Sequence, residues 1–269
     1  MKAFLSGTEF VSAAVFNLVF PDECRLCEQP LKGLSRIPVC ASCLALPAPL
    51  VAEFFCGACR TPFADTYPLN EHGLCSACRE SLANFDTAYS FGSYEGPLRK
   101  LIHLFKYAKV ESLSGPLSRF LIRALPLDRQ FDAVLAMPMH WRKRWERGFN
   151  QAELLAKPIA RRYGLKLKTN LQRARYTKAQ AGLSEAQRRE NLRGSFCVKR
   201  PEEIGNQRVL LIDDVFTTGA TLRAASAALK RAGARHITAL TLARVDHRPV
   251  ETVAGRFSNS AVAGTGAYL

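Results

Sequence analysis

Residues Val209–Thr221 read VLLIDDVFTTGAT, and this stretch decides the fold. Its first four residues are an uninterrupted aliphatic run, which is typical of a parallel strand buried on both faces. A turn containing Gly219 follows, and Ala220–Ala232 then has the composition of a helix that ends at Gly233. With a further strand predicted at His236–Leu242, the order is strand, turn, helix, strand. That order is a βαβ unit, so the sequence predicts an α/β fold.

The predicted turn has the chemistry of a phosphate site. Gly219 lets the backbone approach a ligand closely, and the amides around it can surround an anion at the positive end of the following helix. The residues expected to bind there are Thr217, Thr218, Gly219, Ala220 and Thr221. A polar turn without a ligand is the structural alternative.

Two adjacent carboxylates, Asp213 and Asp214, stand directly before the turn. They cannot bind phosphate themselves, because like charges repel. We expect them to accept hydrogen bonds from two ribose hydroxyls or to hold a bridging Mg²⁺. Adjacent acids after four aliphatic residues are uncommon in a plain strand–turn–helix, which favours the ligand-binding interpretation.

A first basic segment, Pro138–Gln151, follows a predicted strand at Phe131–Ala136 and precedes a helix expected to begin near Asn150. The cations of this segment could together neutralise a phosphorylated leaving group such as pyrophosphate. A solvated basic loop is the alternative. Pro158 must kink the following helix or end it. The candidate pyrophosphate contacts are His140, Arg142, Lys143 and Arg147, and the candidate catalytic residues are Asp213, Asp214, Arg142 and Arg147.

A second basic segment, Arg173–Phe196, is long and polar for a connection within a domain. Such segments are often active-site lids, and a lid would protect a reactive centre from water. Its candidate contacts are Arg173, Lys178, Gln180, Arg188, Arg189 and Asn191.

Eight of the nine cysteines form four Cys-x-x-Cys pairs, namely Cys24/Cys27, Cys40/Cys43, Cys56/Cys59 and Cys75/Cys78. Two such pairs supply the four ligands of a structural zinc ion, so four pairs predict two zinc sites. The simplest assignment is sequential, with the first two pairs on one ion and the last two on the other; an interleaved cross-brace stays open. A redox site would need only one pair, and disulfides would need an oxidising compartment. The ninth cysteine, Cys197, is expected to be a core residue.

The formal net charge of +15 is unevenly distributed. Residues 1–84 contain 6 Lys and Arg against 8 Asp and Glu, so the remainder of the chain carries +17. That charge attracts polyanions, either nucleic acid or phosphorylated small molecules. The cysteine-rich part is acidic even before its thiolates are counted, which favours a structural or protein-docking role over a DNA-binding one.

Phe10–Phe20 is apolar but has only 11 residues, against the ~20 that a membrane span needs. Pro-Asp-Glu follows it in place of a cleavage site, so a packing helix within residues 1–20 is favoured over a signal peptide. We expect no membrane span and a cytoplasmic protein. The expected domains are a double zinc ribbon at 21–84, the α/β domain at 85–244 and a loose tail at 245–269.

At every position, Val209–Thr221 resembles the signature of type I phosphoribosyltransferases that binds phosphoribosyl pyrophosphate (PRPP). The basic segments, the four cysteine pairs and the motifs Tyr94–Pro97 and Leu104–Tyr107 extend the likeness, and over about residues 16–244 the chain resembles the competence protein F family. Trp141 and Pro158 depart locally from the family pattern. The resemblance implies a Rossmann-like type I phosphoribosyltransferase domain behind a small N-terminal double zinc ribbon, and a link to natural transformation and the use of imported DNA.

The expected activity is that of a pentosyl-transferring glycosyltransferase, which moves ribose 5-phosphate from PRPP–Mg²⁺ with release of pyrophosphate. The acceptor is not fixed by the sequence. The alternative is a protein without turnover, either a PRPP or nucleotide sensor or an adaptor that binds single-stranded DNA and DNA-uptake proteins. Trp141, Trp145 and Phe149, interleaved among arginines, are suited to base stacking, although packing is their commoner role.

Overall fold

The computed structural model describes residues 23–31, 36–80, 84–126, 128–173 and 194–245, and its centre is a five-stranded sheet of order β3-β9-β8-β4-β5. The strands are Thr87–Ser93 (β3), Ala133–Ala136 (β4), Leu167–Lys168 (β5), Arg208–Phe216 (β8) and His236–Arg244 (β9). All neighbouring pairs in this sheet are parallel. Their carboxyl ends therefore meet at one edge, which is where open α/β sheets bind ligands.

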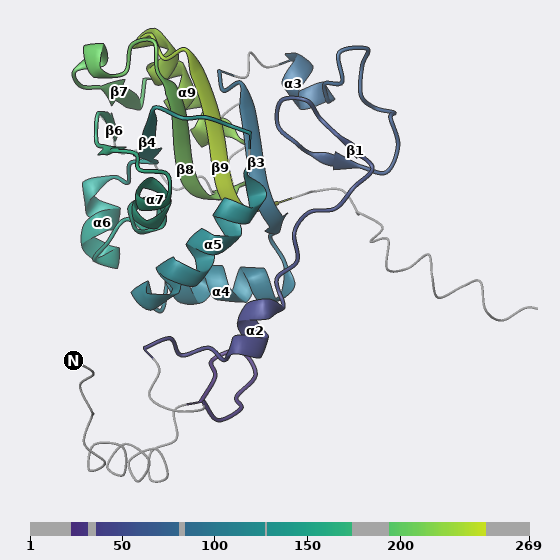
Figure 1. Ribbon diagram of the computed structural model, residues 1–269, viewed down its shortest axis with the longest axis vertical. Helices are drawn as coiled ribbons and strands as arrows, with labels where there is room; N and C mark the ends of the chain where they lie inside the picture. Colours follow the sequence, from purple (N-terminus) through teal and green to yellow (C-terminus); the bar gives the residue numbers. More distant parts are fainter. Residues whose placement is uncertain (1–22, 32–35, 81–83, 127, 174–193, 246–269) are drawn as a thin grey trace, which may run out of the picture.

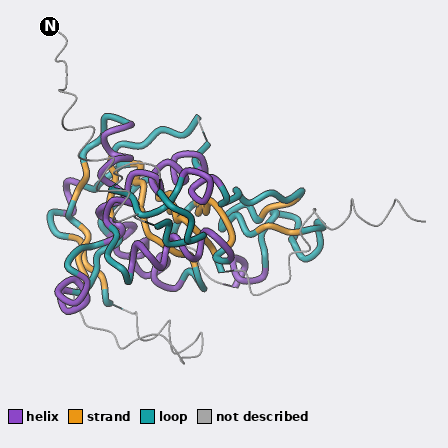
Figure 2. Tube along the Cα trace, turned by 90° about the horizontal axis from the view of Figure 1, so that it is seen from below, coloured by secondary structure: helices purple, strands orange, loops and turns teal. Residues whose placement is uncertain are grey.

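Helices cover both faces of the sheet and enclose its strands (Figures 1 and 2). They are Gly96–Lys106 (α4), Ser114–Ala124 (α5), Gln151–Arg162 (α7) and Ala220–Arg231 (α9). Side chains of a strand alternate between the two faces. Leu210 and Ile212 of β8 accordingly lie in one core with α4, α5 and α7, whereas Val209 and Leu211 lie in a second core with α9. All four are fully buried, as the aliphatic run predicts.

The predicted α/β pattern is confirmed, with differences at the element ends. Strand β8 continues past its aliphatic run to Phe216, so both aspartates belong to the strand. Pro158 does not end α7, which runs through it from Gln151 to Arg162. Pro158 is only half-buried, at a point where the buried face of the helix is made by Leu155 and Ile159 on either side.

The expected pyrophosphate loop is largely a short helix, Trp141–Arg147 (α6). His140 caps its first turn, since the His140 Nδ1 atom accepts a hydrogen bond from the amide of Arg142 at 3.3 Å. Gly148 ends the helix in the left-handed conformation, with φ of 87°. The sequence did not predict this helix, because four Lys and Arg residues between a predicted strand and a predicted helix suggested a loop.

The cysteine-rich part contacts both faces of the sheet. It contains the short helices Ala41–Ala45 (α2) and Ser76–Glu80 (α3) and the hairpin strands Phe54–Phe55 (β1) and Pro62–Phe63 (β2). Cys24 and Cys43 pack in the core of α4 and α5, whereas Cys56 and Cys75 pack in the core of α9. In Figure 1, α2 accordingly lies beside α4, while α3 and β1 lie on the side of β3.

Two parts of the cysteine-rich region pack on opposite faces of the sheet. The chain that connects them runs along β3, the edge strand. The amide of Leu50 donates to the carbonyl of Phe91 at 2.7 Å, and the amide of Ala88 donates to the carbonyl of Ala58 at 2.8 Å. A Cβ atom at Gly92 would lie 2.8 Å from the carbonyl oxygen of Ala48, so glycine is required for this close approach. The connection thus covers an edge that would otherwise be open to other chains.

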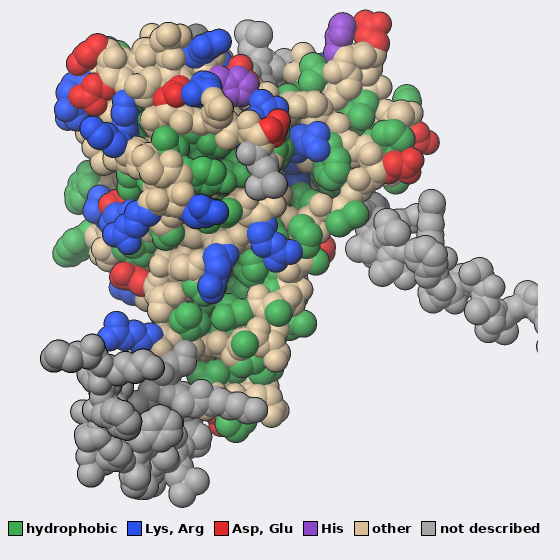
Figure 3. Space-filling model, in the orientation of Figure 1, with side chains coloured by type: hydrophobic (Ala, Val, Ile, Leu, Met, Phe, Trp, Pro, Cys, Tyr) green, Lys and Arg blue, Asp and Glu red, His purple; other side chains and the backbone are tan. Residues whose placement is uncertain are grey.

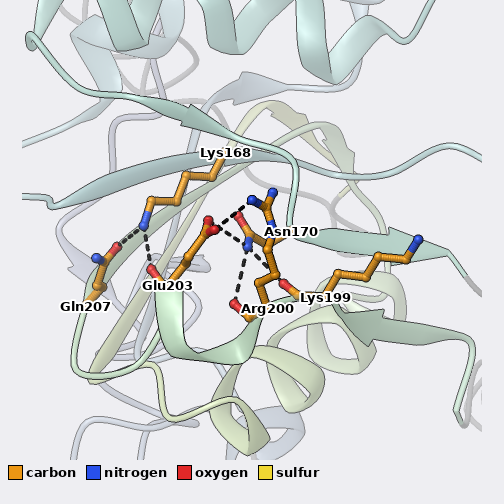
Figure 4. Close-up of polar contacts among 6 residues, drawn as sticks. All are labelled: Lys168, Asn170, Lys199, Arg200, Glu203 and Gln207. Atoms are coloured by element: carbon orange, nitrogen blue, oxygen red, sulfur yellow. Dashed lines mark hydrogen bonds and ion pairs between the residues drawn. The ribbon is translucent and has the colours of Figure 1, made fainter.

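At the other side of the sheet, a hairpin of Leu171–Arg173 (β6) and Phe196–Val198 (β7) is fixed by a polar cluster (Figure 4). The Asn170 side chain donates to the carbonyl of Lys199 at 2.9 Å and to Glu203 Oε2 at 3.1 Å. Lys168 Nζ donates to Gln207 Oε1 at 2.9 Å. The cluster holds the hairpin against the 3₁₀ helix Pro201–Glu203, and Arg173 is the last residue of β6.

Some expectations fall outside the described residues or are wrong. The expected helix at 1–20 and the tail from residue 246 lie outside the described ranges. Cys197 on β7 is exposed, so the expectation of a core residue is wrong. Within the described ranges, every helix falls short of the length and apolar character that a membrane-spanning segment requires.

Candidate functional site

The turn after β8 is open toward an anion. Gly219 has φ of 72° and stands at the start of α9 without a side-chain cap. Within the described part of the chain, the amides of Thr217, Thr218 and Gly219 donate no backbone or side-chain hydrogen bond that closes the turn. Three N–H groups thus remain at the positive end of a helix, which is the arrangement that binds phosphate. The guanidinium of Arg223 borders the turn, because its NH2 atom donates to the carbonyl of Thr218 at 2.7 Å.

The two aspartates have different surroundings. Asp214 Oδ1 forms an ion pair with Lys106 Nζ at 2.9 Å, and both side chains are largely buried. Burial raises the pKa of Asp213 to about 7, and the charge of Asp214 acts in the same direction. The side chain of Asp213 also accepts a hydrogen bond from the amide of Asp214 at 2.9 Å. Asp214 is therefore ion-paired, while Asp213 titrates near neutral pH.

Lys106 is the functional candidate that sequence analysis missed. It is the last residue of α4, and its ion pair makes the end of this helix one wall of the acidic site. Burial lowers the pKa of Lys106, but the attraction of Asp214 outweighs burial, so the pKa is raised overall. The motif Leu104–Tyr107 contained the signal, since it is part of the family likeness; its role could not be assigned without knowing that α4 ends beside β8.

Two of the expected pyrophosphate contacts lie within electrostatic reach of the acidic site. Burial lowers the pKa of Arg173, and the charge of Asp213 partly opposes this shift. Burial and the charges of Arg173 and Arg147 lower the pKa of Lys143, whereas Asp214 raises it. Lys143 of α6 and Arg173 of β6 thus lie within electrostatic range of Asp214 and Asp213, respectively.

The other expected contacts on α6 have local partners. Burial and the charges of Arg173 and Arg142 lower the pKa of His140, which is the cap of α6. Arg147 donates to Gln151 Oε1 at 3.3 Å, and its guanidinium lies 5.3 Å from the centre of the Tyr107 ring. Arg142 lies over the ring of Trp141 at 5.2 Å. The remaining expected contacts, Lys178, Gln180, Arg188, Arg189 and Asn191, lie outside the described residues.

Of the three aromatic residues in the first basic segment, two are exposed and one is buried. Trp141 and Trp145 are 65% and 86% exposed, whereas Phe149 is buried and packs on Phe105 with ring centres 5.7 Å apart. Phe149 therefore has the packing role that is commoner for such residues, and only the two tryptophans are exposed for base stacking. Figure 3 shows Lys and Arg side chains across the middle of the face that carries α4 and α5, with few acidic side chains between them.

A pocket of about 400 Å³ lies at the opposite edge of the sheet, where β8 and β9 begin. Its lining includes Phe131, Arg208, His236 and Thr238. Because the turn lies at the carboxyl ends of the same strands, this pocket is separate from the candidate site.

The eight paired cysteines form two groups in sequential order. Cys24, Cys27, Cys40 and Cys43 form the first cluster, and Cys56, Cys59, Cys75 and Cys78 form the second cluster; in each, the four sulfur atoms lie within 4.8 Å of one another. A tetrahedral zinc ion with Zn–S bonds of about 2.3 Å would separate its sulfur atoms by about 3.8 Å. The Sγ atoms of Cys27 and Cys40 are 3.8 Å apart, and those of Cys59 and Cys75 are 3.7 Å apart. Both clusters therefore have the donors and the spacing for zinc.

Comparison with known proteins agrees with this geometry. A family model described as "Phosphoribosyl transferase domain" matches residues 150–260, which include β8, the turn, α9 and β9. Competence protein F of Haemophilus influenzae is 33% identical over 169 residues, which cover 60% of this chain and 74% of that protein. The chain belongs to the competence protein F family.

Other relatives in the family carry the name DNA utilization protein YhgH. The one from Salmonella typhimurium is 29% identical over 234 residues, which cover 84% of this chain and 99% of the relative. The relative from Escherichia coli K12 is 28% identical over the same length. The family assignment and the expected fold class, a parallel sheet of the phosphoribosyltransferase type with two four-cysteine clusters, are confirmed.

Solved structures are similar to part of the chain. A structure described as the allosteric regulatory enzyme of purine biosynthesis is 21% identical with a TM-score of 0.34, over 49% of this chain and 26% of that one. The adenine phosphoribosyltransferase of Thermoanaerobacter pseudethanolicus is 20% identical with a TM-score of 0.31, over 52% of this chain and 83% of that one.

Proposed function

We propose that the turn at residues 217–221 binds the 5-phosphate of PRPP and that the protein transfers the phosphoribosyl group to an acceptor with release of pyrophosphate. The observation that carries the proposal is the open turn at the start of α9, directly after two aspartates at the carboxyl edge of the sheet. The turn amides bind the phosphate, and the aspartates accept hydrogen bonds from the ribose hydroxyls. Mg²⁺, when bound with PRPP, would neutralise part of the pyrophosphate charge, and Asp213 and Asp214 are the residues that would hold it.

The ion pair with Lys106 restricts how Asp214 can bind a ribose hydroxyl or a cation. The ion pair uses Asp214 Oδ1, so the hydroxyl or the cation must share the carboxylate through its other oxygen. Lys106 also places a positive charge against the acidic pair and holds one oxygen of Asp214 in position. The lysine therefore fixes the orientation of one member of the acidic pair.

In the proposed reaction, the acceptor forms a bond to C1 of the ribose while the C1–O bond to pyrophosphate breaks. The leaving pyrophosphate takes the electron pair, and Lys143 and Arg173 stabilise its growing charge. Such transfers depend on positioning and electrostatic stabilisation more than on covalent help from the protein. The sequence-level candidates Arg142 and Arg147 belong to the same basic group, with local partners in this structure.

Thermal denaturation with PRPP and Mg²⁺ tests the proposed binding site. We expect a higher melting temperature for the wild type and no shift for Asp213→Asn/Asp214→Asn, because neutral amides bind Mg²⁺ and hydroxyls less well. Asp132→Asn is the matched control, since Asp132 is a paired carboxylate of the same domain near the start of β4. No shift of the wild type would contradict the proposal. Pyrophosphate release over a panel of bases and nucleosides then separates an enzyme from a sensor.

A second candidate function is binding of single-stranded nucleic acid. Exposed Trp141 and Trp145 among the arginines of α6 favour it, because bases stack on such rings while arginines contact phosphates. The names of the relatives, which refer to competence and DNA utilization, also support it. We expect Trp141→Ala/Trp145→Ala to weaken oligonucleotide binding without changing its salt dependence, and Arg142→Ala/Arg147→Ala to reduce that dependence. Tyr67→Ala, at a ring 85% exposed in the cysteine-rich part, is the control; an equal loss there would contradict this candidate.

We further propose that each cysteine cluster holds one structural zinc ion and that the protein acts in the cytoplasm, on PRPP or a nucleotide. The sulfur spacing of both clusters supports the metal assignment. Elemental analysis of the purified protein is expected to find about two zinc ions per chain, and a metal-free folded protein would contradict it.

A further inference from the structure

Arg244, the last residue of β9, is a charged side chain in the interior. It is 4% exposed, and its NH1 atom donates to the carbonyl of Cys59 at 2.8 Å. Its NH2 atom donates to Thr61 Oγ1, and its Nε atom has no partner among the described residues. A buried guanidinium is unfavourable unless its donors are satisfied. Arg244 therefore depends on the second cluster for its acceptors.

The direction of these hydrogen bonds connects Arg244 to a metal ligand. Arginine has only donors, so Thr61 Oγ1 accepts from Arg244, and its own proton is free to point at Cys59 Sγ, 2.9 Å away. A hydroxyl that donates to sulfur stabilises the thiolate, the form that binds metal. Arg244 thus orients the group that supports Cys59.

On its other side, Arg244 contacts the residue that supports the turn. Its guanidinium carbon lies 5.0 Å from the centre of the Phe216 ring. That ring is buried directly beneath Gly219, since a Cβ atom at Gly219 would lie 2.8 Å from Phe216 Cζ. The backbones of Arg244 and Phe216 are also paired across β8 and β9. A continuous series of contacts therefore runs from Cys59 to Gly219.

We propose that Arg244 is a positioning residue that couples the second cluster to the turn, so that metal bound by Cys56, Cys59, Cys75 and Cys78 holds the turn in its anion-binding form. The role of this coupling in ligand binding rests on the proposed function. The contacts from Cys59 to Gly219 do not depend on that function. When the metal leaves, Arg244 loses its acceptors, Phe216 loses the cation over its ring, and the turn loosens. The first cluster packs in the other core, against α4 and α5, and provides an internal control.

Hydrogen exchange of the amides of Ala220 and Arg223, which donate to Thr218 Oγ1 and to the carbonyl of Gly219, tests the coupling in the full-length zinc-loaded protein. We expect Arg244→Met and Cys59→Ser to speed this exchange by about tenfold or more, because the turn then opens without global unfolding. Cys27→Ser removes a ligand of the first cluster and should change the exchange by less than about twofold. Unchanged exchange in Arg244→Met would overturn the proposal, as would an equal effect of Cys27→Ser and Cys59→Ser.

Zinc affinity gives a second readout that a purely structural role would not move. Competition with a chromophoric chelator should show about 10- to 100-fold weaker binding at the second cluster in Arg244→Met, the range typical of outer-shell partners of metal ligands. Arg244→Lys should restore part of the affinity, because an ammonium can donate to one of the two acceptors. Thr61→Val is a milder variant in case Arg244→Met does not fold, and it should also weaken zinc binding. Wild-type affinity in both Arg244→Lys and Thr61→Val would overturn the coupling.

These readouts are independent of PRPP. If the wild type fails to bind PRPP but the exchange and zinc results are as expected, the proposed function fails and the coupling stands. If the wild type binds PRPP and Arg244→Met binds it equally well, the coupling is wrong.

Discussion

At the scale of single residues, Asp213 gives the site a pH dependence. Burial raises its pKa to about 7, so the folded protein carries a proton there at lower pH that the unfolded chain has lost. A cation must displace this proton, so we expect affinity for PRPP–Mg²⁺ to rise with pH up to about 7, by at most about tenfold per unit, and then to level off. Calorimetric titrations between pH 5.5 and 8.5 measure it. Asp213→Asn should abolish the slope, and a slope that survives this change would assign the titration to another group.

The same raised pKa predicts the sign of the stability change. Because the native state holds the proton more tightly than the unfolded chain, Asp213 favours folding below its unfolded pKa near 4 and loses this contribution as pH rises through about 7. Replacement by Asn removes this loss. We therefore expect Asp213→Asn to gain stability relative to the wild type at pH 8 compared with pH 5, as measured by urea denaturation at both pH values.

Gly219 is the position of the turn at which we expect substitution to be tolerated least. Its φ of 72° disfavours any side chain, and an added Cβ atom would collide with the Phe216 ring at 2.8 Å. We expect Gly219→Ala to lower the free energy of unfolding by about 1–3 kcal/mol and to weaken PRPP binding. Gly164→Ala is the matched control, because Gly164 has φ of 63° with open space around it. Equal ligand binding by both variants would show that the ring contact does not shape the turn.

At the scale of elements, α7 contains a proline that we expect to lower the stability of the fold. Pro158 cannot donate to the carbonyl of Leu154, and its ring crowds that group. We expect Pro158→Ala to raise the free energy of unfolding by about 1–2 kcal/mol, less than the ~3 kcal/mol cost of an interior proline because the unfolded chain also gains freedom. Urea denaturation measures the change. A loss of stability would mean that the proline ring packs better than its half-exposed position indicates.

Local signals made several elements predictable. The aliphatic run of β8 and the spacing of Leu98, Leu101, Ile102 and Phe105 identify a buried strand and the buried face of α4, and all four of these α4 residues are buried. By contrast, α6 has few apolar residues and was expected to be a loop. Its ends are set by the cap at His140 and the left-handed Gly148, which the basic composition obscured.

At the scale of the whole molecule, the sequence did not predict the contacts between residues that are far apart in the chain. The pair Lys106–Asp214 and the contact of Arg244 with Cys59, 185 positions apart in sequence, arise only when the sheet order is known. Cysteine spacing predicted the two clusters, but the placement of the first in the core of α4 and α5 and the second in the core of α9 depends on the covering of β3. The cysteine-rich part is therefore structurally continuous with the sheet, which composition alone could not indicate.

The central claim is that main-chain N–H groups of the turn bind a sugar phosphate. Nuclear magnetic resonance of the deuterated, ¹⁵N-labelled protein tests it most directly, by following the amide signals of residues 217–221 during titration with PRPP–Mg²⁺ and with ribose 5-phosphate. The account predicts saturable shifts that are largest in these amides for both ligands, since both carry the same 5-phosphate. Saturable shifts elsewhere with the turn signals unmoved, or no saturable shift at all, would contradict it.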